Sequence, residues 1–331
     1  MHCPHGYPVP VIESSKPEAE LWPRTVETVT GELRSLLAAG ELDLPLPGGG
    51  DTAGRWSALI QFGRRDLALA RLAEGHCDAV AILHEAGRAP EPNALYGVWA
   101  AKSPETGAAL DDGVLDGTVR FCSGAHHLDR ALIAASGRLV EIEVDERVRP
   151  VPGTWQPQGM EASDSPDVVL SRIPVTEQML VGEEGFYLSR PGFWLGGAGV
   201  AAVWFGGVVG VLDELVGLDR ELDEHQYAHL GALHTSLRST EALFEQAASH
   251  VDAAPFAEHT TLSWTCRAAA EQLGWQVLDR APKVAGVTTL CRNARFAQRL
   301  ADLQVYVRQH HGERDLAALG RAVHEQAGAK R

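Results

Sequence analysis

The sequence has little that would support a disulfide framework or a nucleic-acid surface. Its 331 residues include five cysteines, an odd and widely scattered set without a C-x-x-C pair. This pattern argues against structural disulfides and against a cysteine-based zinc site. Positive charge is also scarce, because 29 Lys and Arg face 44 Asp and Glu, which gives a formal net charge of −15. Nucleic-acid affinity comes largely from Lys and Arg that replace counterions, so we expect no nucleic-acid partner.

The sequence also lacks an uninterrupted apolar run long enough to cross a membrane. Its longest apolar stretch, residues 191–216, is rich in glycine and carries Asp213 and Glu214. A spanning helix needs about 20 lipid-compatible residues, so we expect this stretch to be a buried helix and expect no membrane partner. The first ten residues, MHCPHGYPVP, have neither a basic start nor an apolar segment before a cleavage site. We therefore expect a cytoplasmic protein.

Several short motifs of known chemistry are missing. The glycine-rich run 192–210 follows no βαβ pattern and lacks the Lys-Ser/Thr of a P-loop, so its small residues more simply allow close helix packing. No G-x-S-x-G nucleophile motif occurs, which disfavours acyl-transfer hydrolysis. His225 and His229 share a helix face near Glu221, but the spacing fixes no third ligand. We expect no metal site.

Apolar periodicity divides the chain into three parts and predicts an α+β fold. The parts are an N-terminal helical domain with an irregular lead-in over residues 1–92, a middle β domain over 93–184 and a C-terminal helical bundle over 185–331. In the middle part, Ser136 and Gly137 form a two-residue hairpin signal. Pro255 and Pro282 are expected to break helices in the last part. Helices are expected over 25–39, around 59 to 72, and over 79–85, 191–218, 224–251, 262–278, 290–309 and 314–326, and strands over 95–101, 118–122, 130–135, 139–144 and 168–171.

Three blocks in the middle of the chain point to a known family. They are GTVRFCSGAHHLDRALIAAS (117–136), TWQPQGMEASDSPDVVLSRIPV (154–175) and VGEEGFYLSRPGFWLGGAGVAAVWFG (181–206). Their order and spacing resemble those of the acyl-CoA dehydrogenase superfamily, which has an aromatic-x-Ser/Thr strand, a strand ending in Val-Pro and an Arg that opens a small-residue helix. The resemblance extends over roughly residues 57 to 320.

The resemblance implies a cofactor and residues that would hold it. Members of the superfamily bind FAD between the middle domain, the last domain and a neighbouring subunit, and they form dimers or tetramers. Phe121 matches the aromatic residue along the flavin ring, and Ser123, beyond Cys122, matches the hydroxyl at the reactive N5 edge. Without the neighbouring blocks, residues 121–123 would more simply be an ordinary half-buried strand, and the blocks turn the balance toward a flavin site. Trp99, Ala101 and Lys102 match a segment beside the flavin pyrimidine, where Lys102 would stabilise the reduced ring or would simply face solvent.

The catalytic residues implied by the resemblance are only partly present. Arg190 matches the family's Arg at the start of the first bundle helix, although a surface Arg is an alternative reading. Residues 291–295, CRNAR, resemble the R-D-A-[KR] segment that precedes the family's catalytic glutamate, whose position is taken here by Ala301. The alternative base position is taken by Ser189. Asp302 follows Ala301 directly, about 100° further around a helix, and is the remaining candidate base.

These features leave three functions open. The leading hypothesis is an FAD-dependent oxidoreductase that acts on a small acyl or acyl-like substrate without the usual glutamate base. The second is a flavin-dependent monooxygenase of the same fold, and the third is a non-catalytic oligomeric binding protein. The missing R-K-x-F-G stretch predicts weak FAD affinity. Expected partners are an electron acceptor or a flavin reductase, and a homo-oligomer, because the stretch 191–216 is too apolar to be left exposed.

Overall fold

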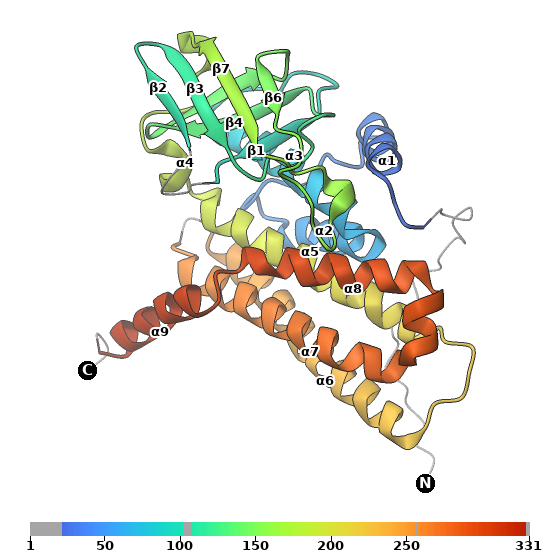
Figure 1. Cartoon of the computed structure of the whole chain (residues 1–331). Coiled ribbons are helices and arrows are strands. Elements are labelled where there is room, and N and C mark those ends of the chain that lie inside the picture. Colours follow the sequence, from blue (N-terminus) through green and yellow to red (C-terminus); the bar gives the residue numbers. More distant parts are fainter. Residues whose placement is uncertain (1–21, 102–106, 256, 329–331) are drawn as a thin grey trace.

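The computed structural model describes residues 22–101, 107–255 and 257–328, and their elements follow the order helical, β and helical. Figure 1 shows the sheet at the top of the view, the long bundle helices below it and α3 between the two. One continuous apolar core runs from the first helix through the sheet into the bundle. The expected α+β class is confirmed. The expected domain limits at residues 92 and 184 stay predictions.

The N-terminal helices are set by side-chain caps. They are α1 (Val26–Ala38), α2 (Thr52–Arg65) and α3 (Leu67–Glu85). Thr25 caps α1 in a reciprocal capping box with Thr28. Asp66 ends α2 and begins α3, because its Oδ1 accepts the Leu69 N–H at 2.6 Å. The expectation of separate helices near 59 to 72 and over 79–85 was wrong, since the break lies at this cap and α3 is continuous.

The middle part is a mixed sheet with the strand order β1-β4-β2-β3-β7-β6, in which β5 also pairs with β4. β1 runs parallel to β4, whereas β4 and β5 form an antiparallel hairpin. The turn of the β4–β5 hairpin consists of Ser136 and Gly137, whose φ of 47° and 80° confirm the predicted two-residue turn. The strands are β1 (Tyr96–Trp99), β2 (Ala108–Asp111), β3 (Val114–Val119), β4 (Arg130–Ala135), β5 (Arg138–Glu143), β6 (Val148–Pro150) and β7 (Val168–Pro174).

The C-terminal part is a bundle from which the last helix projects (Figure 1). Pro255 lies in the break between α6 and α7, as expected, but Pro282 lies inside α7. The helix is interrupted four residues later, at Gly286, whose φ of 74° is non-helical. The bundle consists of α4 (Phe186–Ser189), α5 (Gly192–Val216), α6 (Glu224–Ala253), α7 (Thr260–Arg292), α8 (Ala294–Tyr306) and α9 (Glu313–Gly328).

Helix α5 is the central helix of this bundle. By length and composition it is the one helix of the described residues that could cross a membrane, yet 83% of its most apolar window is buried inside the protein. Its glycines let α2 approach closely, as the sequence predicted. A Cβ on Gly206 would lie 2.1 Å from the Ile60 carbonyl oxygen, and one on Gly63 of α2 would lie 2.2 Å from the Val203 oxygen. The two helices therefore pack backbone against backbone.

This close packing predicts opposite effects for two glycine-to-alanine changes. Gly206→Ala should lower the free energy of unfolding by about 1 to 3 kcal/mol, because a methyl group must push α2 away from α5. Gly231→Ala is the matched control on exposed α6, where nothing lies within 4 Å of the added Cβ. It should raise the free energy of unfolding by up to about 1 kcal/mol through helix propensity. Urea unfolding of both variants checks this, and equal effects would contradict the packing.

Candidate functional site

A cavity of about 520 Å³ lies where the sheet meets the bundle. Its walls come from α3, β1, α5, α7 and α9, together with the residues that join α8 to α9. Its lining is both charged and aromatic. The residues are Arg71, Glu74, Gly75, Asp78, Val98, Tyr187, Arg190, Phe193, Trp194, Gly196, Gly197, Val200, Trp264, Arg267, Gln309, His311, Arg314, Asp315, Ala318 and Arg321. A second cavity of about 800 Å³ lies between α6, α7 and α9, and only Trp264 lines both.

Helix α3 supplies the acidic wall of the first cavity. Arg71, Glu74 and Asp78 recur at spacings of three and four residues, so they share one face of α3. Arg71 Nη1 lies 2.8 Å from Glu74 Oε2. Burial raises the pKa of the Glu74 carboxyl, although the Arg71 charge opposes that shift. A carboxyl whose pKa is raised in this way is suited to act as a general acid or base.

Arg190 joins this acidic face to the start of α5. Its side chain is 1% exposed, Nη1 donates to Glu85 Oε1 at 3.0 Å, and Nη2 lies 3.5 Å from Asp78 Oδ2. The guanidinium also lies 5.9 Å from the centre of the Tyr187 ring. Both carboxylates lie on α3, so Arg190 is a fixed and neutralised charge in the cavity wall. The alternative that Arg190 is an ordinary surface arginine is therefore wrong.

Arg267 of α7 is a cation of a different kind. Its Nη1 donates to the Gly197 carbonyl at 2.9 Å, its Nη2 donates to the Gln309 carbonyl at 3.2 Å, and its guanidinium lies 4.8 Å from the Trp204 ring centre. Among the residues that the structure describes, no carboxylate lies within 4.0 Å of it. Burial lowers the pKa of the guanidinium. Arg267 is thus held by neutral groups in a cavity wall.

A separate pocket of about 10 Å³, which is room for one water molecule, lies beneath β1 beside the first cavity and reaches Trp99 and Ser123. The two share Arg71, Gly75 and Val98 in their lining. The Trp99 indole donates to the Ser123 carbonyl at 3.1 Å, and Ser165 Oγ donates to Ser123 Oγ at 2.9 Å. Ser123 therefore has its own hydroxyl hydrogen available for a further acceptor.

The residues around Ser123 form a loop, which corrects the expected strand over 118–122. Strand β3 ends at Val119, and Phe121, two residues later, has a left-handed φ of 56°. The Phe121 side chain is 53% exposed, and the Arg120 guanidinium lies 5.2 Å from its ring centre. Cys122 is buried, and its N–H donates to the Pro166 carbonyl at 2.9 Å.

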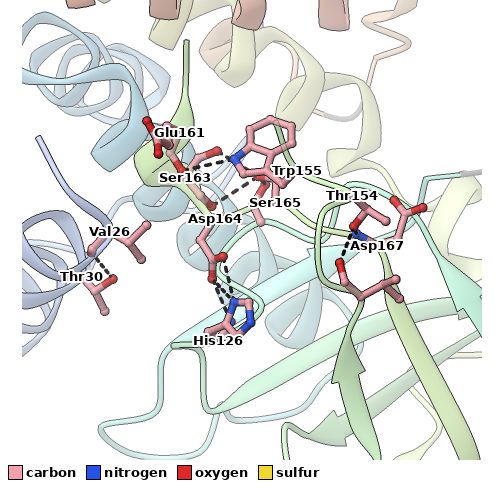
Figure 2. Close-up of polar contacts among 12 residues, drawn as sticks. Val26, Thr30, His126, Thr154, Trp155, Glu161, Ser163, Asp164, Ser165 and Asp167 are labelled. Carbon is pink, nitrogen blue, oxygen red and sulfur yellow. Dashed lines mark hydrogen bonds and ion pairs between the residues drawn. The ribbon is translucent and has the colours of Figure 1, made fainter. Parts of the chain in front are cut away.

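Asp164 ties this loop to the segment that carries Ser165. Figure 2 shows its carboxylate pointing at the His126 imidazole, where Oδ1 and Nδ1 are 2.9 Å apart. The carboxylate also accepts the His126 N–H at 2.9 Å, and the Asp164 carbonyl accepts the Gly124 N–H at 2.8 Å. Asp164 itself adopts a left-handed φ of 44°. These contacts fix the relative position of Ser123 and Ser165.

The other sequence candidates lie apart from the cavity. Ala101 is exposed beyond β1, and Lys102 lies outside the described residues. Asp302 is 2% exposed and does not line the cavity, because its Oδ1 accepts the Met160 N–H and lies 3.2 Å from Gln298 Nε2. Its neighbour Ala301 lies against Gly159, where a Cβ would come within 2.2 Å of the Ala301 carbonyl. Within the described residues no group of three His, Cys, Asp or Glu is placed to hold a metal ion.

Most residues of the cavity lining were missed by sequence reasoning, and three of them are instructive. Arg71 and Glu74 had a signal, since charges at helical spacing interrupt the otherwise apolar α3. Arg267 had none, because its partners Gly197 and Gln309 are far away in the sequence. The resemblance did single out Arg190, which lines the cavity, and Trp99 and Ser123, which line the small pocket beside it.

The burial of Asp302 predicts a pH-dependent stability. Burial raises the pKa of Asp302 from 3.8 to about 7, so the folded protein holds a proton that the unfolded chain releases between about pH 4 and pH 7. The free energy of unfolding therefore falls as pH rises through that window, by up to about 4 kcal/mol for this group. Asp302→Asn keeps an acceptor for Met160 and cannot ionise, so it should gain stability relative to wild type by about 3 kcal/mol between pH 5 and pH 8.

Urea unfolding at pH 5 and at pH 8 measures how the stability of Asp302→Asn changes relative to that of wild type. Asp279→Asn is the control, because the Lys283 ammonium lowers the pKa of the exposed Asp279 and no proton is exchanged in that range. The control should track wild type. If Asp302→Asn also tracked wild type, Asp302 would ionise normally in the folded protein.

The comparisons with known proteins rest on structure alone, since no family model and no curated protein matches the sequence. The FMN and indole complex of TdsC from Paenibacillus sp. A11-2 is 17% identical, with a TM-score of 0.70 over 89% of this chain and 95% of that chain. Methanesulfinate monooxygenase MsuC from Pseudomonas fluorescens is 19% identical, with a TM-score of 0.70 over 93% and 98%. An electron transferring flavoprotein of Acidaminococcus fermentans is 14% identical, with a TM-score of 0.76 over 90% and 93%.

These identities are low, and what they show is the fold. TdsC is a dibenzothiophene monooxygenase, so two of the three similar structures are monooxygenases and one contains FMN. The similarity spans nearly the whole length of each chain, including both helical parts and the sheet. The described residues have the acyl-CoA dehydrogenase-like fold.

Proposed function

We propose that this protein is a flavin-dependent monooxygenase whose substrate binds in the 520 Å³ cavity. The observation that carries the proposal is the charged lining of that cavity. A saturated acyl chain gains free energy only when it is buried against apolar groups, whereas Arg71, Glu74 and Asp78 form one wall here. A polar substrate suits such walls better, and the similar monooxygenase structures favour oxygenation over desaturation.

The loop at Ser123 carries groups that a flavin would contact. Ser123 has a hydroxyl hydrogen to donate, and the N5 edge of an isoalloxazine ring is an acceptor. Phe121 is exposed on the same loop, where the Arg120 guanidinium lies over its ring and offers a cation. We assign FAD as the cofactor, following the sequence resemblance, and FMN is the alternative because TdsC binds it.

A bound flavin would supply two-electron redox chemistry and, when reduced, reaction with oxygen. The chain's own residues have separate tasks. Ser123 would donate its hydroxyl hydrogen to the ring edge, and the Trp99 and Ser165 hydrogen bonds hold Ser123 in place. Glu74, whose pKa is raised by burial, would take up or release a proton at its carboxylate. Trp194 and Trp264 exclude water from one side of the cavity.

The positions of Ala301 and Asp302 argue against the hypothesis that the protein desaturates an acyl thioester. Dehydrogenation of a thioester needs a carboxylate within hydrogen-bond reach of the α-proton. Ala301 and Asp302, where the resemblance puts the base, pack against Gly159 and Met160 instead of lining the cavity. Glu74 lines the cavity but is held by Arg71 among charged groups.

The proposed function needs an electron source, and we propose a flavin reductase as that partner.

We also propose that the chain forms a homo-oligomer, a dimer or tetramer, in the cytoplasm. The sequence argument from stretch 191–216 does not hold, because α5 is buried within its own chain. Helix α9 is a better contact surface, since it projects from the body and exposes Val323 to 53% and Leu316 to 37%.

Flavin binding should depend on Ser123. The purified protein, dialysed against excess FAD, should take up one flavin per chain, and Ser123→Ala should weaken binding about 10- to 100-fold. This is the effect of losing one hydrogen bond to a polarised group, about 1.5 to 3 kcal/mol. Ser171→Ala on β7, where the serine bonds Arg149, is the matched control and should bind normally. Absence of binding of both FAD and FMN at micromolar concentration would rule out the proposed function.

Saturated acyl-CoA compounds should not reduce the bound flavin. Under anaerobic conditions, a panel of straight-chain and branched acyl-CoAs should leave the flavin absorbance unbleached, because no suitably placed base removes the α-proton. In air, the same holoprotein with a flavin reductase and NADH should consume oxygen. If acyl-CoA bleached the flavin absorbance anaerobically and Asp302→Asn abolished that bleaching, the protein would be an acyl-CoA dehydrogenase with Asp302 as its base.

A further inference from the structure

We propose that the cavity selects an anionic aromatic compound, a one- or two-ring system with a carboxylate that binds Arg267. This inference rests on the proposed function in that it names the substrate class of the same site. It follows from the charge of the lining, from the partners of each arginine and from the order of the aromatic side chains.

The lining is positive in a strongly negative protein. Five of its residues are arginines and three are acidic, so 5 − 3 gives a formal charge of +2, against −15 for the whole chain. An anion is therefore repelled by most of the surface and attracted at this cavity. The charged residues are Arg71, Arg190, Arg267, Arg314 and Arg321, with Glu74, Asp78 and Asp315.

Among the described residues Arg267 has no carboxylate within 4.0 Å, and the Asp315 and Glu74 carboxylates of the same lining attract it only at longer range. Arg71 is paired with Glu74, and Arg190 is paired with carboxylates of α3. Arg267 has five N–H groups, of which the Gly197 and Gln309 carbonyls accept two. The Trp204 ring and these carbonyls orient the guanidinium without neutralising it. A carboxylate in the cavity would complete this site with charge-assisted hydrogen bonds.

The aromatic side chains provide the place for a ring. Tyr187, Phe193, Trp194 and Trp264 form a row of edge-to-face contacts, with ring centres 5.6, 5.2 and 5.2 Å apart in that order. Gly197 of α5 also lines this space, and a Cβ added there would be in van der Waals contact with Ser263 and Arg267. A planar ligand can lie against these groups with its anionic end at Arg267. A volume of about 520 Å³ accommodates one or two rings.

The test compares an acid with its neutral amide. Binding of 1-naphthoate and 1-naphthamide to the purified full chain is measured by calorimetry at pH 7.5 and low salt, in the absence and in the presence of excess FAD. Naphthoate should bind at least tenfold more tightly than naphthamide, and FAD should not displace it. Arg267→Gln should remove this preference, whereas Arg267→Lys should keep part of it.

Arg308→Gln is the matched control. The Arg308 guanidinium lies 4.7 Å from the Trp275 ring centre, much as Arg267 lies over Trp204, but Arg308 does not line the cavity. This variant should bind naphthoate as wild type does. The inference is overturned if acid and amide bind equally or not at all, if both glutamine variants lose the preference alike, or if FAD competes with naphthoate. If Arg267→Gln fails to fold, the Arg267→Lys variant and the acid and amide comparison still decide the question.

The outcomes also separate this inference from the proposed function. Flavin uptake without any preference for the acid leaves the monooxygenase proposal intact and removes the anionic substrate. Selective acid binding by a chain that takes up neither FAD nor FMN keeps the anion site and indicates a non-catalytic binding protein.

Discussion

The pairing of Arg190 with α3 is the constraint on which the site depends. A guanidinium whose side chain is 1% exposed must have counterions, and both of them, Asp78 and Glu85, come from α3. Losing one partner of a buried pair typically costs about 3 to 5 kcal/mol, so α3 and the start of α5 are held at one spacing. The sheet rests on α3 through β1, and the cavity opens beside the pairing.

Elements with strong local signals were predictable from the sequence. The helices α1, α5 and α6 follow clear apolar periods, and the hairpin at Ser136 needed only its turn residues. The break between α2 and α3 depends on one side chain, Asp66, which periodicity does not register. Pro282 removes a single hydrogen bond and is tolerated within α7, whereas Gly286 adopts the positive φ that interrupts the helix.

The candidate site was predictable only where family resemblance supplied long-range information. Ser123 and Arg190 are more than 60 residues apart, and nothing in periodicity brings them to neighbouring pockets. Arg267 was missed because its role comes from remote carbonyls and from the absence of a carboxylate within 4.0 Å in the described residues. The fold is thus shared with similar flavin proteins, while the charged lining depends on individual side chains of α3 and α7.

The most direct test of the central claim is a crystal structure of the protein grown with FAD. We predict electron density for the isoalloxazine ring next to the loop that carries Ser123, with one ring edge within hydrogen-bond distance of Ser123 Oγ and the large space toward Arg267 left open for a substrate. A ring bound away from Ser123, or one that fills the space beside Arg267, would contradict the assignment of this cavity as the place where flavin and substrate meet.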